Sequence, residues 1–361
     1  MSLANTVLGV IWFGVIAYAI FGGADFGAGI WDLVAGGPEK GKHPRALLER
    51  SIGPVWEANH VWLIFVLVFL WTGFPDAFVS IMTTLYIPMM LAGIGIVLRG
   101  SAFAFRKWAP TLGGRQALGA AFAGASVVTP FFLGTVAGGV ASGRVPPGNA
   151  AGDAWTSWIN PTSILGGVLA VVVCAYVAAV LVSRDADRSE LGDLAEYFRV
   201  RALVAGMAAG VLALVGAFVI RSDAPTLYDG LSRSYGLVIV AISGIAGVAS
   251  LAAIYFRKRR MARVGAVAAT VTILWGWAVG QYPWLLPEYL TIEQGAAADV
   301  VLVALLVAFV AAAAIAVPAL IWLLTLTDRG TLDATSPTLA GSSEALLSAL
   351  DERARARISD D

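Results

Sequence analysis

The residues best suited to chemistry in this sequence are acids that stand inside apolar segments. Asp25 and Asp32 lie in the first apolar segment and Glu57 lies in the second, where His60 follows it by three positions. An ionised side chain near the centre of a bilayer costs at least about 2.5 kcal/mol, so an acid that is kept there indicates a function. Buried carboxylic acids can exchange protons near neutral pH, and a neighbouring histidine extends such a relay. Asp25 and Glu57, with His60 beside Glu57, therefore predict steps of a proton path.

Helical spacing defines the surroundings of these acids. Glu57 and His60 lie three residues apart and so share one helical face. Gly23 and Gly27, on either side of Asp25, leave room for a second helix to approach, so we expect the Asp25 side chain to face protein. A structural alternative stays open for Glu57, which would then pair with His60 or an arginine only to satisfy a contact between helices.

Other polar residues have a simpler explanation beside a functional one. Arg99 ends the third apolar segment, where an arginine usually sets topology, although a structural or partner contact would also explain it. The basic run 257–260 is likewise typical of a topology signal, although anionic lipid would bind it. Trp56 and Asn59 flank Glu57 and are expected to make structural or partner contacts.

The elements that must position these residues are membrane-spanning helices. The chain has 361 residues, of which 58% are hydrophobic and 13% charged, against roughly 25% charged residues in soluble domains. A helix needs about 20 apolar residues to cross the hydrocarbon core. Nine such segments are predicted, at residues 3–33, 52–72, 77–98, 116–140, 162–182, 200–220, 237–256, 264–280 and 300–326.

The basic residues give these segments a direction. Of the 24 lysines and arginines, 21 lie in odd-numbered connections or the tail and 3 lie in even-numbered connections. Cytoplasmic loops carry the excess of basic residues, so the N-terminus is predicted outside and the C-terminus in the cytoplasm. On this orientation Asp25 lies roughly 13 Å along the helix from its cytoplasmic end, and Asp32 lies near the aqueous interface.

We expect one polytopic membrane domain over residues 1–327 and a short polar cytoplasmic tail over residues 328–361. The first segment lacks a charged leader and a cleavage site, so it is expected to be retained as a span. Cys174 is the single cysteine and is expected to be a packing residue, with no disulfide within the chain. The net charge of zero gives no support for nucleic-acid binding.

Motifs of soluble cofactor enzymes are absent from the sequence, which has no P-loop, no GxGxxG, no CxxC and no HExxH. His43 lies in the first connection, which leaves His60 as the only histidine in a predicted span. A haem held by two histidines within the bundle therefore cannot be built from this chain. Any redox centre is expected in a partner.

The second segment carries a family resemblance. Residues 51–64 read Ser-Ile-Gly-Pro-Val-Trp-Glu-Ala-Asn-His-Val-Trp-Leu-Ile. They resemble the second span of subunit II of cytochrome bd quinol oxidases, in which a Trp, an Asp or Glu, an Asn and Val-Trp-Leu recur. The glycine-rich segment around Asp25, the stretch 99–106, Asn160 and Pro161 before the fifth span, and the nine spans agree with this resemblance.

The resemblance implies an all-α membrane protein of two four-helix bundles plus one peripheral helix. It implies a heterodimer in the bacterial plasma membrane with a homologous subunit I, which carries two haems b and haem d. That subunit oxidises quinol, and the complex reduces oxygen to water, while subunit II ligates no haem. The family leaves room for a structural quinone in subunit II and for a small accessory membrane subunit.

The resemblance also implies roles for single residues. Glu57 matches an acid on a proton path from the cytoplasm, and Asp25 matches an acid that continues the path towards the haems. Asp32 is then a candidate entrance residue. Trp62 matches an aromatic residue beside a route by which oxygen enters in some members. Glu57 replaces an Asp of some members and His60 replaces a Gln, and both changes keep proton chemistry available.

We therefore expect a non-haem subunit of a quinol oxidase that conducts protons to the site of oxygen reduction. The alternative is a proton-coupled secondary transporter, because glycine-broken spans with buried acids also describe carriers. A carrier predicts such features in both halves of the chain, and the fifth to eighth segments have no counterpart of Asp25 or Glu57. A third interpretation is a purely structural partner that seals the haem subunit.

Overall fold

The structure, a computed structural model, describes residues 2–37, 40–52, 56–106, 108–109 and 111–328. The chain divides into two units, Met1–Leu302 and Val303–Asp361, and each is described by itself. Within the described residues, eight helices are long and apolar enough to cross a membrane, and Asn59–Gly73 forms a shorter apolar helix. The architecture is therefore the all-α membrane fold that the sequence predicts.

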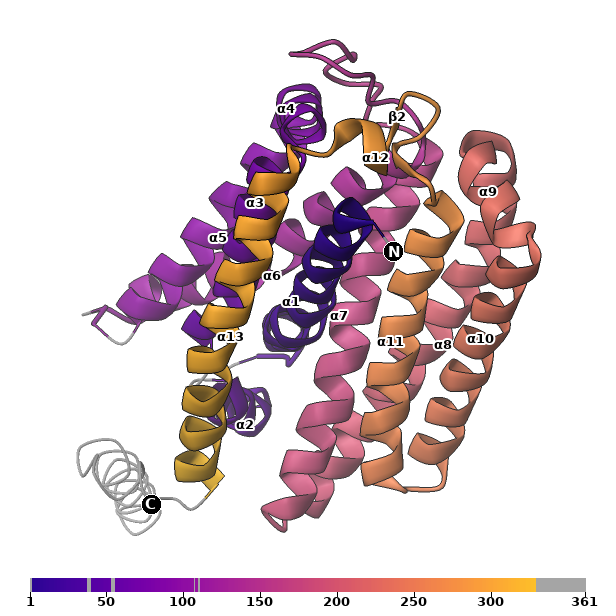
Figure 1. Ribbon diagram of the computed structural model, residues 1–361. Coiled ribbons are helices and arrows are strands. Elements are labelled where there is room, and N and C mark those ends of the chain that lie inside the picture. The colour runs from indigo at the N-terminus through magenta and orange to yellow at the C-terminus, as the bar shows by residue number, and fades with distance from the viewer. Residues whose placement is uncertain (1, 38–39, 53–55, 107, 110, 329–361) are drawn as a thin grey trace, which may run out of the picture. The chain divides into compact units, whose positions relative to one another are not determined.

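The unit Met1–Leu302 consists of two halves of similar organisation (Figure 1). The first half contains α1 (Leu3–Leu33), α2 (Lys42–Ile52), α3 (Trp56–Gly73), α4 (Pro75–Thr84), α5 (Tyr86–Arg106) and α6 (Leu112–Ala141). The second contains α7 (Pro161–Arg188), α8 (Gly192–Asp223), α9 (Pro225–Ser232), α10 (Ser234–Tyr255) and α11 (Arg259–Gln281). The order is the same in both halves. In the first, α3 is followed by the short helix α4 and then by α5 and α6; in the second, α8 is followed by the short helix α9 and then by α10 and α11.

A small extramembranous element follows α11. Strands β1 (Trp284–Leu286) and β2 (Leu290–Thr291) pair antiparallel, with Trp284 opposite Thr291, and lead into α12 (Ile292–Gly295). The last helix, α13 (Asp299–Asp328), contains Pro318 and continues into the second unit.

The same kind of bend separates the long and short helices in both halves. The backbone at Phe74 has φ −142° and ψ 64°, and the backbone at Ala224 has φ −139° and ψ 64°. Each is followed by a proline, Pro75 or Pro225, at the first helical position. A residue before proline is disfavoured in the α conformation, so α3 and α8 must end there.

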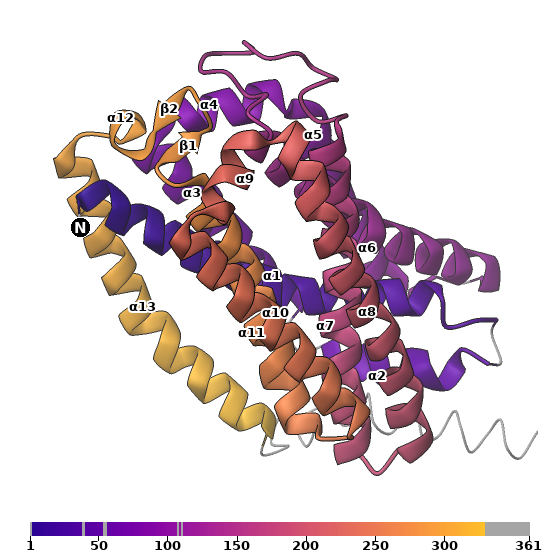
Figure 2. The same ribbon diagram turned by 90° about the vertical axis from the view of Figure 1, so that its right-hand side faces the viewer.

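Helices α1 and α7 run side by side through the unit (Figures 1 and 2). A methyl group at Gly27 would overlap the backbone carbonyl of Cys174, so the two helices touch backbone to backbone. Small residues allow this approach, which maximises packing between helices in a membrane. The indole nitrogen of Trp31 adds a hydrogen bond of 2.7 Å to the carbonyl of Ala175.

One end of the unit is covered by the amphipathic helix α2, and we call it the α2 end. Leu47 and Leu48 of α2 are buried there against Val182 of α7 and Phe198 of α8. The connections from α7 to α8 and from α10 to α11 lie at the same end, whereas α4, α9 and the strand pair lie at the opposite end (Figure 1).

One predicted segment is shifted in the structure. The segment predicted at 77–98 is divided between α4 and the crossing helix α5, which begins at Tyr86 and ends at Arg106. Pro75 starts a short apolar helix that hydropathy cannot distinguish from the beginning of a crossing. The first segment is confirmed at Leu3–Leu33. Residues 329–361 of the predicted tail lie outside the described residues.

Candidate functional site

The acid in the middle of α1 forms a buried ion pair with an arginine of α5. Arg99 Nη1 donates to Asp25 Oδ2 at 2.5 Å, Nη2 donates to Oδ1 at 2.8 Å, and Nη2 also reaches the Asp25 backbone carbonyl at 2.9 Å. The side chains of Arg99 and Asp25 are 2% and 1% exposed, respectively. This is the bidentate geometry in which arginine binds a carboxylate most strongly. Asp25 therefore faces protein, and Arg99 is buried beside it.

Helix α6 completes the surroundings of the guanidinium. Arg99 Nε donates to Ser126 Oγ at 3.0 Å, and Ser126 donates in turn to the carbonyl of Phe122 at 2.7 Å. The guanidinium carbon lies 4.6 Å from the Phe122 ring centroid and 5.1 Å from that of Phe26, distances at which a cation is attracted to a ring. A side chain at Gly29 would overlap Ser126, so the close approach of α1 to α6 requires glycine there.

Asp32 lies at the α2 end with two basic partners. Arg45 Nε of α2 donates to Asp32 Oδ1 at 2.8 Å, and Arg106 Nη1 lies 3.6 Å from Oδ2. Arg45 also donates to the carbonyls of Gly36 and Gly37, so it fastens α2 to the end of α1. Asp32 is buried while both arginines are partly exposed, so this acid connects the interior with the surface.

Two side chains near the ion pair each keep a polar atom without a hydrogen-bond partner among the described residues. They are Tyr18 of α1, through its hydroxyl, and His60 of α3, through Nδ1. Their ring centroids lie 6.2 Å apart, and the Phe26 ring lies 6.3 Å from Tyr18 and 5.9 Å from His60. A buried polar group without a partner costs about 1–3 kcal/mol, so bound water is the usual solution at such places.

The remaining predicted residues lie along α3. Glu57 and Trp56 are in its first turn, but their side chains lie outside the part of the chain that the structure describes. Asn59 is buried. Trp62 packs edge-on against Phe13 of α1 at 5.7 Å between ring centroids, within an apolar part of the α1–α3 interface.

Some members of this site are not expected from the sequence. Tyr18 is one aromatic residue among many in an apolar segment, and nothing in its spacing marks its hydroxyl as buried. Ser126 lies in a long helix rich in small residues and is equally inconspicuous. The burial of Arg99 is not expected because the sequence predicts that its helix ends at residue 98. In the structure the helix continues to Arg106, which places Arg99 inside it.

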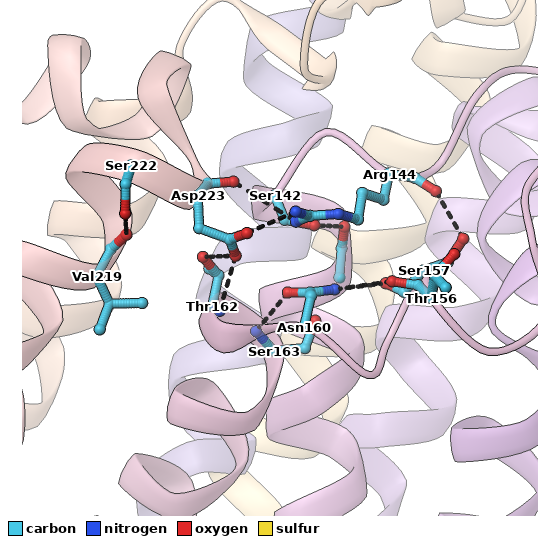
Figure 3. Close-up of polar contacts among 11 residues, drawn as sticks. Ser142, Arg144, Thr156, Ser157, Asn160, Thr162, Ser163, Val219, Ser222 and Asp223 are labelled. Carbon is cyan, nitrogen blue, oxygen red and sulfur yellow. Dashed lines mark hydrogen bonds and ion pairs between the residues drawn. The ribbon is translucent and has the colours of Figure 1, made fainter.

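A second polar network ties α6, α7 and α8 together at the end opposite to α2 (Figure 3). Asp223 Oδ2 accepts hydrogen bonds from the backbone nitrogen of Thr162 at 2.9 Å and from its hydroxyl at 2.6 Å, while Oδ1 accepts from Arg144 at 2.5 Å. Asn160 caps α7 through a bond of 2.9 Å from the backbone nitrogen of Ser163. Asp223 is therefore a structural cross-link at the first turn of α7.

Replacing Asp223 by alanine is expected to lower the melting temperature of the purified protein. The change removes the acceptor for Thr162 and Arg144, and one lost buried hydrogen bond costs about 1–3 kcal/mol. Asp229→Ala is the matched control, because Asp229 is exposed in the neighbouring helix α9. Equal melting temperatures for the two variants, measured by differential scanning fluorimetry, would contradict the cross-link.

Comparison with known proteins follows from this architecture. A family model described as cytochrome bd terminal oxidase subunit II matches residues 3–327. The chain belongs to this family. Among curated relatives, the cytochrome bd ubiquinol oxidase subunit 2 of Bacillus subtilis (strain 168) is 28% identical over 262 residues, which cover 69% of this chain and 72% of the relative. A putative cytochrome bd menaquinol oxidase subunit II of the same organism is 24% identical over 254 residues, 68% and 71% of the two chains.

The fold agrees with a solved member of the family. The bd oxidase from Geobacillus thermodenitrificans matches with a TM-score of 0.77 and 26% identity, covering 91% of this chain and 99% of that chain. A bd oxidase subunit II functions with a subunit I, so the chain is a multi-pass membrane subunit of an oxidoreductase complex.

Oxidases of this family contain haem, and the question is whether the described residues of this subunit could ligate one. No group of three or more His, Cys, Asp or Glu side chains that could hold a metal occurs among them. His43 is exposed on α2, and His60 packs against Tyr18 and Phe26 on α3. The described histidines of this bd oxidase subunit therefore offer no axial pair for a haem.

Proposed function

We propose that this subunit supports a haem-bearing subunit I and conducts protons from the cytoplasm to the site of oxygen reduction. The observation that carries the proposal is the gathering of ionisable and polar groups in the helix interior around the Asp25–Arg99 pair, where lipid chemistry disfavours them. The α2 end, with its basic residues, is assigned to the cytoplasm of a bacterial plasma membrane, which puts the N-terminus outside.

The four acidic and histidine side chains have different parts in this route. Asp32 accepts protons from the surface, which it reaches between the partly exposed Arg45 and Arg106. Glu57 and His60 share a face of α3 and pass the proton inward. His60 Nδ1 has no hydrogen-bond partner among the described residues and can bind water, which supports a hydrated passage at this point.

Asp25 is the innermost step of the proposed route, and its ion pair with Arg99 must open before Asp25 can accept a proton. Its two carboxylate oxygens are occupied by Arg99, so a proton that arrives must displace a bidentate guanidinium. Arg99 keeps its bond to Ser126 and its contacts with Phe26 and Phe122 when that happens, so the cation remains held. The route therefore depends on Arg99 as a positioning residue.

The complex supplies the redox chemistry in this proposal. Two haems b and haem d reside in subunit I, which oxidises quinol, and the complex reduces oxygen to water. Oxygen is apolar and crosses hydrocarbon freely, so the aromatic contact of Trp62 with Phe13 supports an entry route along α3. A structural quinone and an accessory subunit are compatible with this assignment.

The test is oxygen uptake by the purified heterodimer. Glu57→Gln keeps the shape of the side chain and removes its titration, and it is expected to slow quinol-dependent oxygen uptake by roughly 100-fold, the low end for loss of a proton-transfer group. The visible haem spectrum checks that assembly is intact. Asp76→Asn, at an exposed acid of α4, is the matched control.

Two outcomes would overturn the proposal. Full oxygen uptake by an assembled Glu57→Gln enzyme would exclude the proton route and leave a purely structural subunit. Purification of the chain alone, without a haem-bearing partner and with proton-coupled solute uptake in vesicles, would support a secondary transporter instead.

A further inference from the structure

Basic residues gather at the α2 end of the second half, where α7 ends, α8 begins and α10 turns into α11. Residues 184–201 and 257–263 hold nine lysines and arginines and five acids. The basic members are Arg184, Arg188, Arg199, Arg201, Arg257, Lys258, Arg259, Arg260 and Arg263. We call these nine residues the basic surface. The two ranges that contain the basic surface therefore have more basic than acidic residues.

Two acids of this region already have arginine partners. Glu196 pairs with Arg199 at 2.5 Å and with Arg257 at 3.5 Å, and Asp187 pairs with Arg259. The Glu196–Arg199 pair lies within α8, whereas Arg257 and Arg259 connect the start of α11 and the turn before it to α8 and α7. They use two of the five acids of the region.

A group of four arginines remains without an ion pair among the described residues. The Arg184 guanidinium lies within electrostatic reach of Arg188, Arg260 and Arg263, and the one acid in the same group is Asp185. Asp185 faces Arg184, Arg188 and Arg263 together and also accepts a hydrogen bond from a serine, Ser51. Three of the four guanidinium groups share the single Asp185 carboxylate and Arg260 has no part in it, so the cations repel one another, and an external anion would relieve that repulsion.

Arg259 keeps one donor unused, although its Nη1 pairs with Asp187. Its Nε is buried without a hydrogen-bond partner among the described residues. It borders a small cavity between α7, α8, α10 and α11 to which Ser183 and Arg199 also contribute. The cavity has room for about one water molecule, so the unused donor of Arg259 lies inside the protein, next to the basic surface and not on it.

The basic surface is bordered by exposed apolar and aromatic side chains. Tyr255 and Phe256 at the end of α10 are each 67% exposed, and Met261 and Val264 on α11 are 62% and 69% exposed. Aromatic residues of this kind lie at the level of lipid headgroups, with aliphatic ones against the acyl chains. A basic surface beside exposed apolar side chains is complementary to an anionic lipid, because the lipid has a negative charge at one end and hydrocarbon at the other.

We propose that the basic surface binds the headgroup of an anionic phospholipid, with the phosphate between Arg184, Arg260 and Arg263 and the acyl chains along Met261 and Val264. Clusters of four to eight basic residues beside a membrane helix attract anionic lipid at about 1 kcal/mol each. A lipid here would link the α7–α8 and α10–α11 connections across four helices. This inference does not depend on the proton route.

The experiment uses the assembled oxidase in vesicles of phosphatidylcholine with a spin-labelled phosphatidylglycerol. Electron paramagnetic resonance gives the ratio of association of labelled phosphatidylglycerol to labelled phosphatidylcholine. The triple variant Arg184→Gln, Arg260→Gln, Arg263→Gln is expected to lower this ratio by at least about fivefold, the effect of one lost cation at about 1 kcal/mol.

The matched control removes three cations elsewhere, as Lys40→Gln, Lys42→Gln, Arg233→Gln, at exposed positions outside the basic surface. Its lipid ratio is expected to stay that of the unmodified protein. An equal fall in both triple variants, or none in either, would show that the cations act only as a topology signal. Complete loss of the preference on addition of inorganic phosphate, at constant ionic strength, would assign the site to free phosphate and overturn the lipid proposal.

Discussion

Arg99→Gln is expected to lower the yield of assembled oxidase to a small fraction of that of the unmodified protein. The change leaves Asp25 as a buried carboxylate without its cation, and removing one partner of a buried ion pair costs about 3–5 kcal/mol. That is a large part of the stability of an ordinary domain, about 5–15 kcal/mol. The measurement is the yield of haem-containing heterodimer by size exclusion and visible spectroscopy. Asp25→Asn is expected to show a similar loss.

The double variant Asp25→Asn, Arg99→Gln separates the structural role of the pair from its role in proton transfer. Two neutral amides can share hydrogen bonds, so assembly is expected to recover well above either single variant. Oxygen uptake by the assembled double variant is nevertheless expected to stay low, because an amide in place of the Asp25 carboxyl group cannot carry a proton. Additive losses of assembly would contradict the ion pair. Full oxygen uptake would show that Asp25 stabilises the fold without carrying protons.

Gly27→Val is expected to prevent folding of the subunit. The first carbon of any side chain at this position overlaps the backbone carbonyl of Cys174 and crowds Ala178, and a backbone cannot move aside as a flexible side chain can. The cost should therefore exceed the about 1–3 kcal/mol typical of overpacked cores. The measurement is the amount of subunit that copurifies with the haem-bearing partner, together with its thermal stability.

Gly9→Ala on the same helix is the control for this variant. Nothing lies within 4 Å of the added carbon at position 9, so stability is expected to be unchanged or slightly higher. Similar losses in both variants would mean that α1 tolerates no added carbon anywhere. The contact at Gly27 would then have no special part in joining α1 to α7.

The sequence predicts the crossing helices well because hydrocarbon thickness fixes their length. The first segment agrees at both ends with α1. The third predicted segment, 77–98, lies too early in the chain compared with α5, since the short helix α4 is as apolar as a crossing helix. Hydropathy measures partition into lipid and has no term for the bend that Pro75 imposes after Phe74.

That shift explains why the sequence alone favours an interfacial position for Arg99. With the helix ending at residue 98, the arginine stands at its end; with the observed end at Arg106, it stands well inside the helix. Asp25 is recognisable because acids in apolar segments are rare, and its glycine neighbours indicate the protein-facing side. Their pairing joins residues 74 positions apart, which a single sequence does not encode locally.

The backbone contact at Gly27 also divides the interior of the subunit. Where the α1 backbone rests on the carbonyl of Cys174, no water file and no flat ring system fits between α1 and α7. If Asp25 carries protons as proposed, they reach it from the side of α1 that faces α3, α5 and α6, because the contact at Gly27 closes the side that faces α7. On that proposal, substitutions at the surface of the second half are expected to leave the proton route unchanged.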